Sequence, residues 1–273
     1  MILHEFIIPY RSRSDIITIK PCFDWHVGNK YCDERAIRHY LSERDENTYL
    51  IGGGDLIDAV ITKDIKRYMK HTDDTKGDDI IDEQIDRLYS LVKEYEDGHI
   101  IGLGTGNHES TILKHHGTHP IRRLAKQLNT VSLGFSWMVR LRFRKYGKKG
   151  DLQGNVRTIV IRGHHGWGGG SRTQGADLTK YSKDITYWSA DMFLYGHVHR
   201  RQSDKIDRLA WIGSKLISKP KHIFICGTFL KTLSNTDEPT YSEEKGYPPV
   251  SIGGINIRMK PGGKKWVEVD SDV

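Results

Sequence analysis

The chain of 273 residues is long enough for one large domain or two small ones, and its 37% hydrophobic and 28% charged residues are ordinary for a soluble protein. No apolar run reaches the length of a membrane span, and three cysteines without paired spacing argue against a disulfide framework. A net charge of +7 favours an anionic partner, either nucleic acid or a phosphorylated metabolite.

Strands and helices are expected to alternate over the first half of the chain, because apolar runs alternate with apolar residues at helical spacing. The expected strands cover residues 15–20, 47–51 and 99–103, and the expected helices cover residues 33–43, 81–92 and 120–128. The residues before 15 are expected to form a polar, adaptable start. The charged stretch 59–78 is expected to be either a lid or a solvent-facing insertion.

The second half is expected to consist mostly of strands. From Trp137 apolar residues alternate with arginines, as in a strand with one buried face. The expected strands cover residues 137–144, 157–161, 191–195, 223–225 and 255–257. Alternating strands and helices followed by strands predict two sheets packed in a single domain, residues 1–273, with the strands of 200–273 completing the sandwich.

Five expected strands end at turns that carry Asp, Asn or His, mostly beside glycines. These residues are Asp24 and His26, Asp55, Asn107 and His108, His164 and His165, and His197 and His199. A single such turn is better explained by side chains that satisfy local backbone groups. Five turns with this inventory and no cysteine match the ligands of a pair of divalent transition metals. In Asp-x-His and His-x-His both ligands share one face of an extended chain.

The motifs at these turns resemble the ordered signature of the calcineurin-like metallophosphoesterase superfamily, D-x-H, G-D-x-x-D, G-N-H-[DE], a lone histidine turn and G-H-x-H. In this chain they stand at residues 24–26, 54–58, 106–109, 165–166 and 196–199. The resemblance covers residues 15–199, about two-thirds of the chain. It implies an α/β fold, a four-layer α/β/β/α sandwich of two mixed β-sheets flanked by helices, with a dinuclear site at the strand ends.

Carried over position by position, the resemblance implies two divalent metal ions that share the carboxylate of Asp55. One ion would be held by Asp24, His26, Asp55 and His199, and the other by Asp55, Asn107, His165 and His197. His164 stays an alternative to His165, because adjacent residues point to opposite sides of the chain. The family implies Mn²⁺ first, and such ligands also accept Fe, Zn, Ni or Co.

His108 follows a ligand and is not itself a family ligand, so the resemblance makes it the candidate general acid or transition-state stabiliser. Asp58 matches a family position that can orient this histidine, and it could equally cap a helix beginning near Ala59. Arg200 and Arg201 directly follow the His-x-His turn and are candidate contacts for a substrate phosphate.

Three further features give weaker indications of function. The arginine face of Arg140, Arg142 and Arg144 could bind a phosphate backbone or could be a solvated strand face. The histidines His115, His116 and His119 lie near the site in sequence and are explained as easily by surface positions. Asp191 is expected to make a buried hydrogen bond below the site.

Together these features predict a metal-dependent phosphoric ester hydrolase that acts on a phosphodiester or a phosphomonoester. The charge favours nucleic acid or a nucleotide as substrate, with a phosphatase for proteins or small metabolites as the alternative. A non-catalytic scaffold of the same fold is the rival class. Scaffolds of this family typically lose ligands, whereas every motif position is present here.

Cellular location and partners follow from simpler features. The N-terminus has no basic segment followed by a long apolar one, so we expect no signal peptide and a cytoplasmic protein. The expected partner is a phosphate-ester substrate, which includes nucleic acid. We expect no interaction with a membrane. The sequence does not give the oligomeric state.

Overall fold

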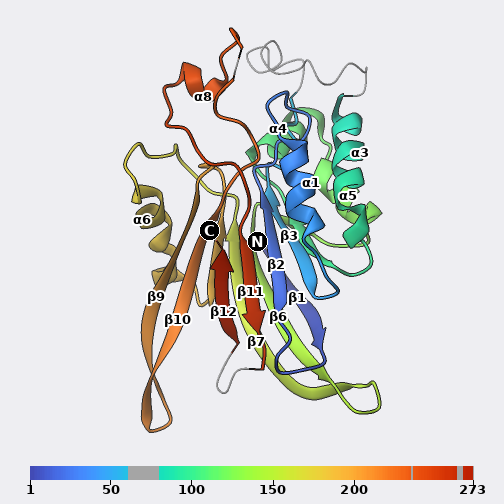
Figure 1. Ribbon diagram of the computed structural model, residues 1–273, viewed down its shortest axis with the longest axis vertical. Coiled ribbons are helices and arrows are strands. Elements are labelled where there is room, and N and C mark those ends of the chain that lie inside the picture. Colours follow the sequence, from blue (N-terminus) through green and yellow to red (C-terminus); the bar gives the residue numbers. More distant parts are fainter. Residues whose placement is uncertain (61–79, 235, 263–266, 273) are drawn as a thin grey trace.

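The computed structural model describes residues 1–60, 80–234, 236–262 and 267–272. Two six-stranded sheets form the centre of the molecule, and helices lie outside them (Figure 1). Sheet A has the order β1 (Ile2–Tyr10), β6 (Ser136–Tyr146), β7 (Leu152–His164), β8 (Met192–Tyr195), β10 (Lys215–Cys226) and β9 (Arg201–Ile212). Sheet B has the order β12 (Glu268–Asp272), β11 (Asn256–Lys260), β2 (Ile17–Phe23), β3 (Thr48–Gly54), β4 (Ile100–Gly104) and β5 (Ser132–Gly134). Both sheets contain parallel and antiparallel pairs.

Helices cover the outer face of each sheet. The helices beside sheet B are α1 (Glu34–Ser42), α3 (Ile80–Val92), α4 (Asn107–His116) and α5 (Pro120–Gln127), with the 3₁₀ turn η1 (Lys93–Tyr95) after α3. The short helices α6 (Ala176–Ser182) and α7 (Asp184–Tyr187) belong to sheet A, and α8 (Tyr241–Glu244) lies in the loop between β10 and β11. None of the helices in the described residues combines the length and apolar composition needed to cross a membrane.

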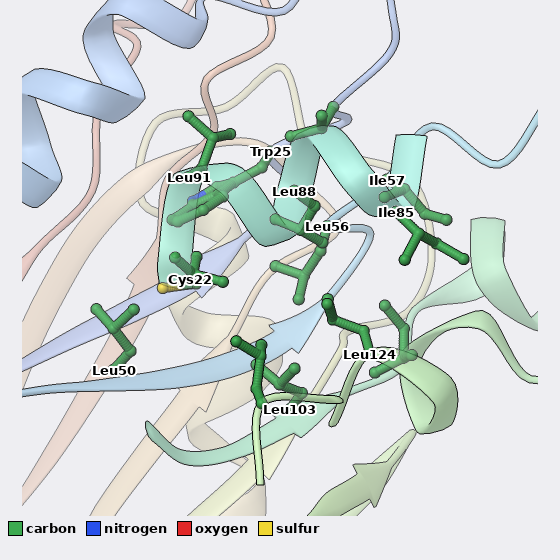
Figure 2. Close-up of a cluster of buried hydrophobic side chains, with 14 of the residues drawn as sticks. Cys22, Trp25, Leu50, Leu56, Ile57, Ile85, Leu88, Leu91, Leu103 and Leu124 are labelled. Atoms are coloured by element: carbon green, nitrogen blue, oxygen red, sulfur yellow. The ribbon is translucent and has the colours of Figure 1, made fainter. Parts of the chain in front are cut away.

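Three clusters of buried hydrophobic side chains fill the spaces between the layers. Outside sheet B, Leu88 of α3 and Leu124 of α5 pack over Leu50 and Leu103 of the strands (Figure 2). A second cluster fills the space between the sheets, where Trp137, Leu141 and Phe143 of sheet A meet Ile19, Ile51 and Ile101 of sheet B. A third lies outside sheet A, where α6 contributes Tyr181. The predicted four-layer α/β/β/α sandwich of two mixed sheets is therefore confirmed.

The N-terminus differs from the prediction. Residues 2–10 form strand β1, which pairs in parallel with β6, whereas a polar, adaptable start was expected. Only two of its residues, Ile8 and Tyr10, are buried, because β1 is an edge strand. The partner strand lies more than a hundred residues away in the sequence, so no local pattern announces the pairing.

The arginine stripe on β6 meets this edge strand. Arg140 and Arg142 form ion pairs with Glu5 of β1, at N–O distances of 2.6 and 3.2 Å. Arg144 instead donates to the backbone oxygens of Leu152 and Gln153. The stripe is therefore engaged with neighbouring strands.

Strands β9 and β10 form a long antiparallel ribbon that projects beyond the sandwich at the bottom of Figure 1. At its tip Leu209, Trp211 and Leu216 are 64%, 83% and 70% exposed. The expected short strand 223–225 is only the buried end of β10. The expected lid, residues 59–78, lies outside the described residues from position 61 onward.

Candidate metal centre

The five motif turns lie where strands of both sheets end. Asp24 and His26 follow β2, Asp55 follows β3, and Asn107 opens helix α4 just after β4, all in sheet B. The turns after β7 and β8 of sheet A contribute the histidines His164, His165, His197 and His199. The two sheets thus bring residues separated by more than 170 positions to one edge, as the chain order of the motifs implies.

The backbone is strained at most of the predicted ligands. Among the described residues, seven that are not glycine have positive φ. Five of these are predicted ligands, with φ between 50° and 71°, namely Asp24, His26, Asp55, His197 and His199. A non-glycine residue held in this region costs about 1–3 kcal/mol. Such strain typically gathers at functional sites, where the surrounding structure fixes the side chains in place.

Asp24, His26 and His199 form the first cluster, with one ligand atom from each within 4.8 Å of the others. The Nε2 atoms of His26 and His199 are 3.1 Å apart, and Asp24 Oδ1 is 3.7 Å from Nε2 of His199. This buried Oδ1 has no hydrogen-bond partner. An orphaned carboxylate oxygen beside converging imidazole nitrogens is the arrangement that a divalent cation would satisfy.

Asp55, His165 and His197 form the second cluster. Asn107 joins it, because its Oδ1 is 2.9 Å from both His165 Nε2 and His197 Nδ1. Asp55 Oδ2 is 3.1 Å from His165 Nε2. Asp55 also belongs to a third group, with His26 and His108, so its carboxylate lies between the two clusters. The donor set of carboxylate, amide and imidazole groups fits two divalent ions that share Asp55.

The two adjacent histidines of the fourth motif have different surroundings. His165 is fully buried among Asp24, Asp55 and Asn107. His164 instead accepts a hydrogen bond at Nδ1 from the N–H of Gly166, and its ring packs edge-on against Phe135 and Trp167. The geometry thus brings His165 to the cluster and leaves His164 outside.

The pKa values of the buried ligands are shifted in different directions. Burial raises the pKa of Asp24 well above its usual range. Burial would also raise the pKa of Asp55, but the neighbouring His108 and His165 hold it well below its usual range. Burial opposes protonation of His165, whereas Asp55 raises its pKa to about 9. The pair of Asp55 and His165 therefore carries opposite charges without a cation, and a bound cation would replace the proton.

His108 lies on the first turn of α4, next to the clusters. Its Nδ1 is 2.7 Å from the carbonyl oxygen of Asp58, which can only accept, so Nδ1 carries a proton. Its Nε2 is 3.8 Å from Asp55 Oδ2. The Nε2 atom is therefore the one that faces the clusters and can exchange a proton there.

Asp58 is buried and lies between two histidines. Its Oδ1 is 3.4 Å from His26 Nδ1 and 3.7 Å from His108 Nδ1. Burial raises its pKa, but hydrogen bonding and charge from these histidines lower the pKa below its usual value. The described residues 59 and 60 are not helical, and the N–H of Ala59 bonds to Gln84. The position of Asp58 suits the orienting role that the motif suggested.

Glu109 is a residue whose importance the sequence reasoning did not identify. Its buried carboxylate accepts backbone N–H groups from Gly106, Asp55, Leu56 and Ile57, at 2.6 to 3.3 Å. Burial and the charge of Asp55 raise its pKa to about 7. The carboxylate ties the turn after β3 to the turn after β4. Its place as the fourth residue of the G-N-H-E motif could have indicated this role.

The two arginines after the His-x-His turn have different environments. Arg200 lines the cavity beside the two ligand clusters, and its Nε is 3.4 Å from the buried Asp177. Arg201 packs against Gly253 and is not among the cavity's lining residues. Asp191 accepts the N–H of Val160 and pairs with Lys219, at the opposite end of β8 from the clusters.

A cavity of about 420 Å³ opens over the clusters. One side carries His26, Asp55, Asn107 and His108, and the other is formed by the loop between β10 and β11. Ion pairs hold this loop to the segment after His26, with Lys30 joined to Glu238 and Lys231 joined to Asp33. The sequence reasoning treated this loop only as part of the closing strands, because its anchors join residues some two hundred positions apart.

Known proteins resemble this chain only distantly. No family model and no curated protein sequence matches the chain. Among solved structures, a predicted phosphoesterase from Streptococcus pneumoniae TIGR4 is 12% identical, covers 94% of this chain and 99% of its own, and has a TM-score of 0.32. Vps29 from Entamoeba histolytica, complexed with Zn²⁺, is 13% identical, covers 67% of this chain and 88% of its own, and has a TM-score of 0.27.

The site residues described above come from the motifs and from the geometry of this chain. With its five motifs and two mixed sheets, and with clusters of potential metal ligands at the strand ends, the chain is similar in sequence pattern and in architecture to the calcineurin-like metallophosphoesterases.

Proposed function

We propose that the protein is a phosphoesterase that uses two divalent metal ions. The observation that carries the proposal is the position of Asp55, which belongs to the second ligand cluster and to a group that shares His26 with the first, beside a cavity large enough for a substrate. The first ion would be held by Asp24, His26, Asp55 and His199, and the second by Asp55, Asn107, His165 and His197. Mn²⁺ is the first candidate, and Zn²⁺, Fe, Ni and Co suit the same ligands.

When bound, two such ions would stabilise charge on a phosphoryl group and acidify the attacking water. The chain's own residues complete the reaction. As the bond between phosphorus and the ester oxygen breaks, His108 Nε2 donates a proton to the departing oxygen. The carbonyl oxygen of Asp58 keeps the other proton on Nδ1, and the Asp58 carboxylate lies 3.7 Å from the same nitrogen.

The net charge of +7 supports an anionic substrate and favours nucleic acid or a nucleotide, with a phosphomonoester of a protein or small metabolite as the alternative. Phosphate diesters and monoesters are both compatible with the clusters. A scaffold without activity is disfavoured by the complete ligand set and by the position of His108.

The test compares hydrolysis of bis-p-nitrophenyl phosphate and p-nitrophenyl phosphate by metal-stripped protein refilled with Mn²⁺. We expect diester hydrolysis that disappears on chelation and falls about 10²- to 10⁴-fold in His108→Ala. His116→Ala, an exposed position on the same helix, is the matched control and should retain activity. Hydrolysis of the monoester alone would indicate a phosphatase. Failure to bind any divalent metal would refute the proposal.

A further inference from the structure

The cavity over the metal clusters has two chemically different walls. The wall of Asp, Asn and His side chains suits metal ions and a phosphate group. The facing wall includes the aromatic and aliphatic side chains of Tyr31, Leu230, Tyr241, Tyr247, Pro248 and Val250, beside Lys231 and the hydroxyl residues Thr232, Thr240 and Ser242. A phosphate bound to the clusters therefore leaves its ester group beside flat and apolar side chains.

The exposed tyrosines make this wall suited to a planar ring. Tyr241 and Tyr247 are 52% and 40% exposed, and their ring centroids are 6.2 Å apart with planes inclined by 56°. Partly exposed aromatic faces at a cavity are where planar bases stack, since every nucleobase offers a π-face. The cavity's 420 Å³ lies in the range of about 300–1,000 Å³ that holds a single small molecule.

The wall is also held firmly in place. Tyr31 donates to the backbone oxygen of Glu238, whose carboxylate pairs with Lys30. Thr240 caps α8 by accepting the N–H of Glu243, and it donates to the carbonyl oxygen of Thr232. A wall fixed before binding loses little conformational entropy when a ligand stacks on it.

Lys231 and Arg200, which line the cavity, are already paired with carboxylates. Lys231 is 3.1 Å from Asp33, and Arg200 contacts Asp177. A substrate with several phosphate groups would need additional cations away from the clusters, and these two side chains are engaged. A single phosphate joined to a planar group matches the cavity better.

We propose that this wall is a nucleobase subsite, so that the substrates are phosphate esters of a nucleoside. The base stacks against Tyr247, with Tyr241 beside it, while its phosphate lies at the clusters. This inference rests on the proposed function, because it needs a phosphate group held at the ligand clusters. It does not require that the ester is hydrolysed. The proposed base-binding surface is formed mainly by the loop between β10 and β11, which lies outside the five motifs.

The test is a binding experiment that does not depend on turnover. Protein loaded with Mn²⁺ is titrated by calorimetry with adenosine 5′-monophosphate, uridine 5′-monophosphate and ribose 5-phosphate, which differ in the base. We expect at least one nucleotide to bind about tenfold more tightly than ribose 5-phosphate, an effect in the range of one stacked base. Equal affinities for all three would overturn the proposal.

Two variants separate stacking from a general effect on the site. Tyr247→Ala should remove the preference for the nucleotide and leave the affinity for ribose 5-phosphate unchanged. Tyr187→Ala, at a position on α7 that is 79% exposed and outside the cavity lining, should change neither affinity. A loss of affinity for both ligands in Tyr247→Ala would overturn the stacking role. Tight nucleotide binding without hydrolysis of any ester would keep the subsite and refute the proposed activity.

Discussion

Replacing Glu109 by glutamine should disconnect the two turns that hold Asp55 and Asn107. One carboxylate oxygen, Oε1, accepts the N–H groups of Leu56 and Ile57, and the other, Oε2, accepts those of Asp55 and Gly106. A glutamine can present an acceptor to only one of these pairs, because its NH₂ group donates. The other two N–H groups then lose their partner while they stay buried.

The magnitude follows from the two lost contacts. A hydrogen bond to a charged group contributes about 1.5–3 kcal/mol, so the loss of two amounts to about 3–6 kcal/mol of unfolding free energy. This is a large share of the roughly 5–15 kcal/mol that stabilises a typical domain. Because the pKa of Glu109 is raised to about 7, the measurement is made at pH 8, where the carboxylate is mostly ionised.

The assay is equilibrium unfolding in urea, with Mn²⁺ binding measured on the same samples. Glu94→Gln is the matched control, since the side chain of Glu94 is 74% exposed. We expect Glu109→Gln to shift the midpoint strongly and to weaken metal binding, and Glu94→Gln to do neither. A change in Glu109→Gln below about 1 kcal/mol would show that the four backbone contacts are not what holds the turns together.

Three further predictions follow from the site and the core. Gly106→Ala should weaken metal binding at least tenfold, because its Cβ would lie 2.1 Å from Asp55 Oδ1, whereas Gly154→Ala has no atom within 4 Å of the new Cβ and should bind normally. Burial and the nearby Lys205 lower the pKa of His222 to about 4, so unfolded protein binds more protons between about pH 4 and 6.5 and stability should fall as pH falls through this window. Melting temperatures at pH 5 and pH 7 should differ less in His222→Gln, and an unchanged difference would contradict this. Restoring Mn²⁺ to stripped protein at a hundred times its dissociation constant should stabilise the fold by about 2.7 kcal/mol, and thermal melting at matched concentrations would show no shift if the clusters bind no metal.

The parts of the fold that sequence could predict are those with a local signal. Buried strands ending in ligand-bearing turns are legible because the apolar run and the turn are adjacent in the chain, as at Ile17–Phe23 and Asp24. Helix α3 was predicted for the same reason, since Ile85, Leu88 and Val92 recur at helical spacing and are buried.

Other parts depend on contacts between distant residues. Helix α4 was not predicted, because only Glu109 and Ile112 of its ten residues are buried and no apolar stripe marks it. Strand β1 needs its distant partner β6. The choice between His164 and His165 needs the depth of each ring in the fold, which the adjacent letters of the sequence do not contain.

The origin of the ligands from two sheets has a consequence for how the protein unfolds. Each cluster joins residues after strands of sheet B to histidines after strands of sheet A, as Asp24 does with His199 and Asp55 with His165. An ion bound in either cluster would therefore act as a cross-link between the two halves of the sandwich. In the loaded protein the ends of β2, β3, β7 and β8 should exchange their amide hydrogens together, as one cooperative unit. In the stripped protein only the apolar contacts between the sheets join these ends, and we expect them to exchange less cooperatively.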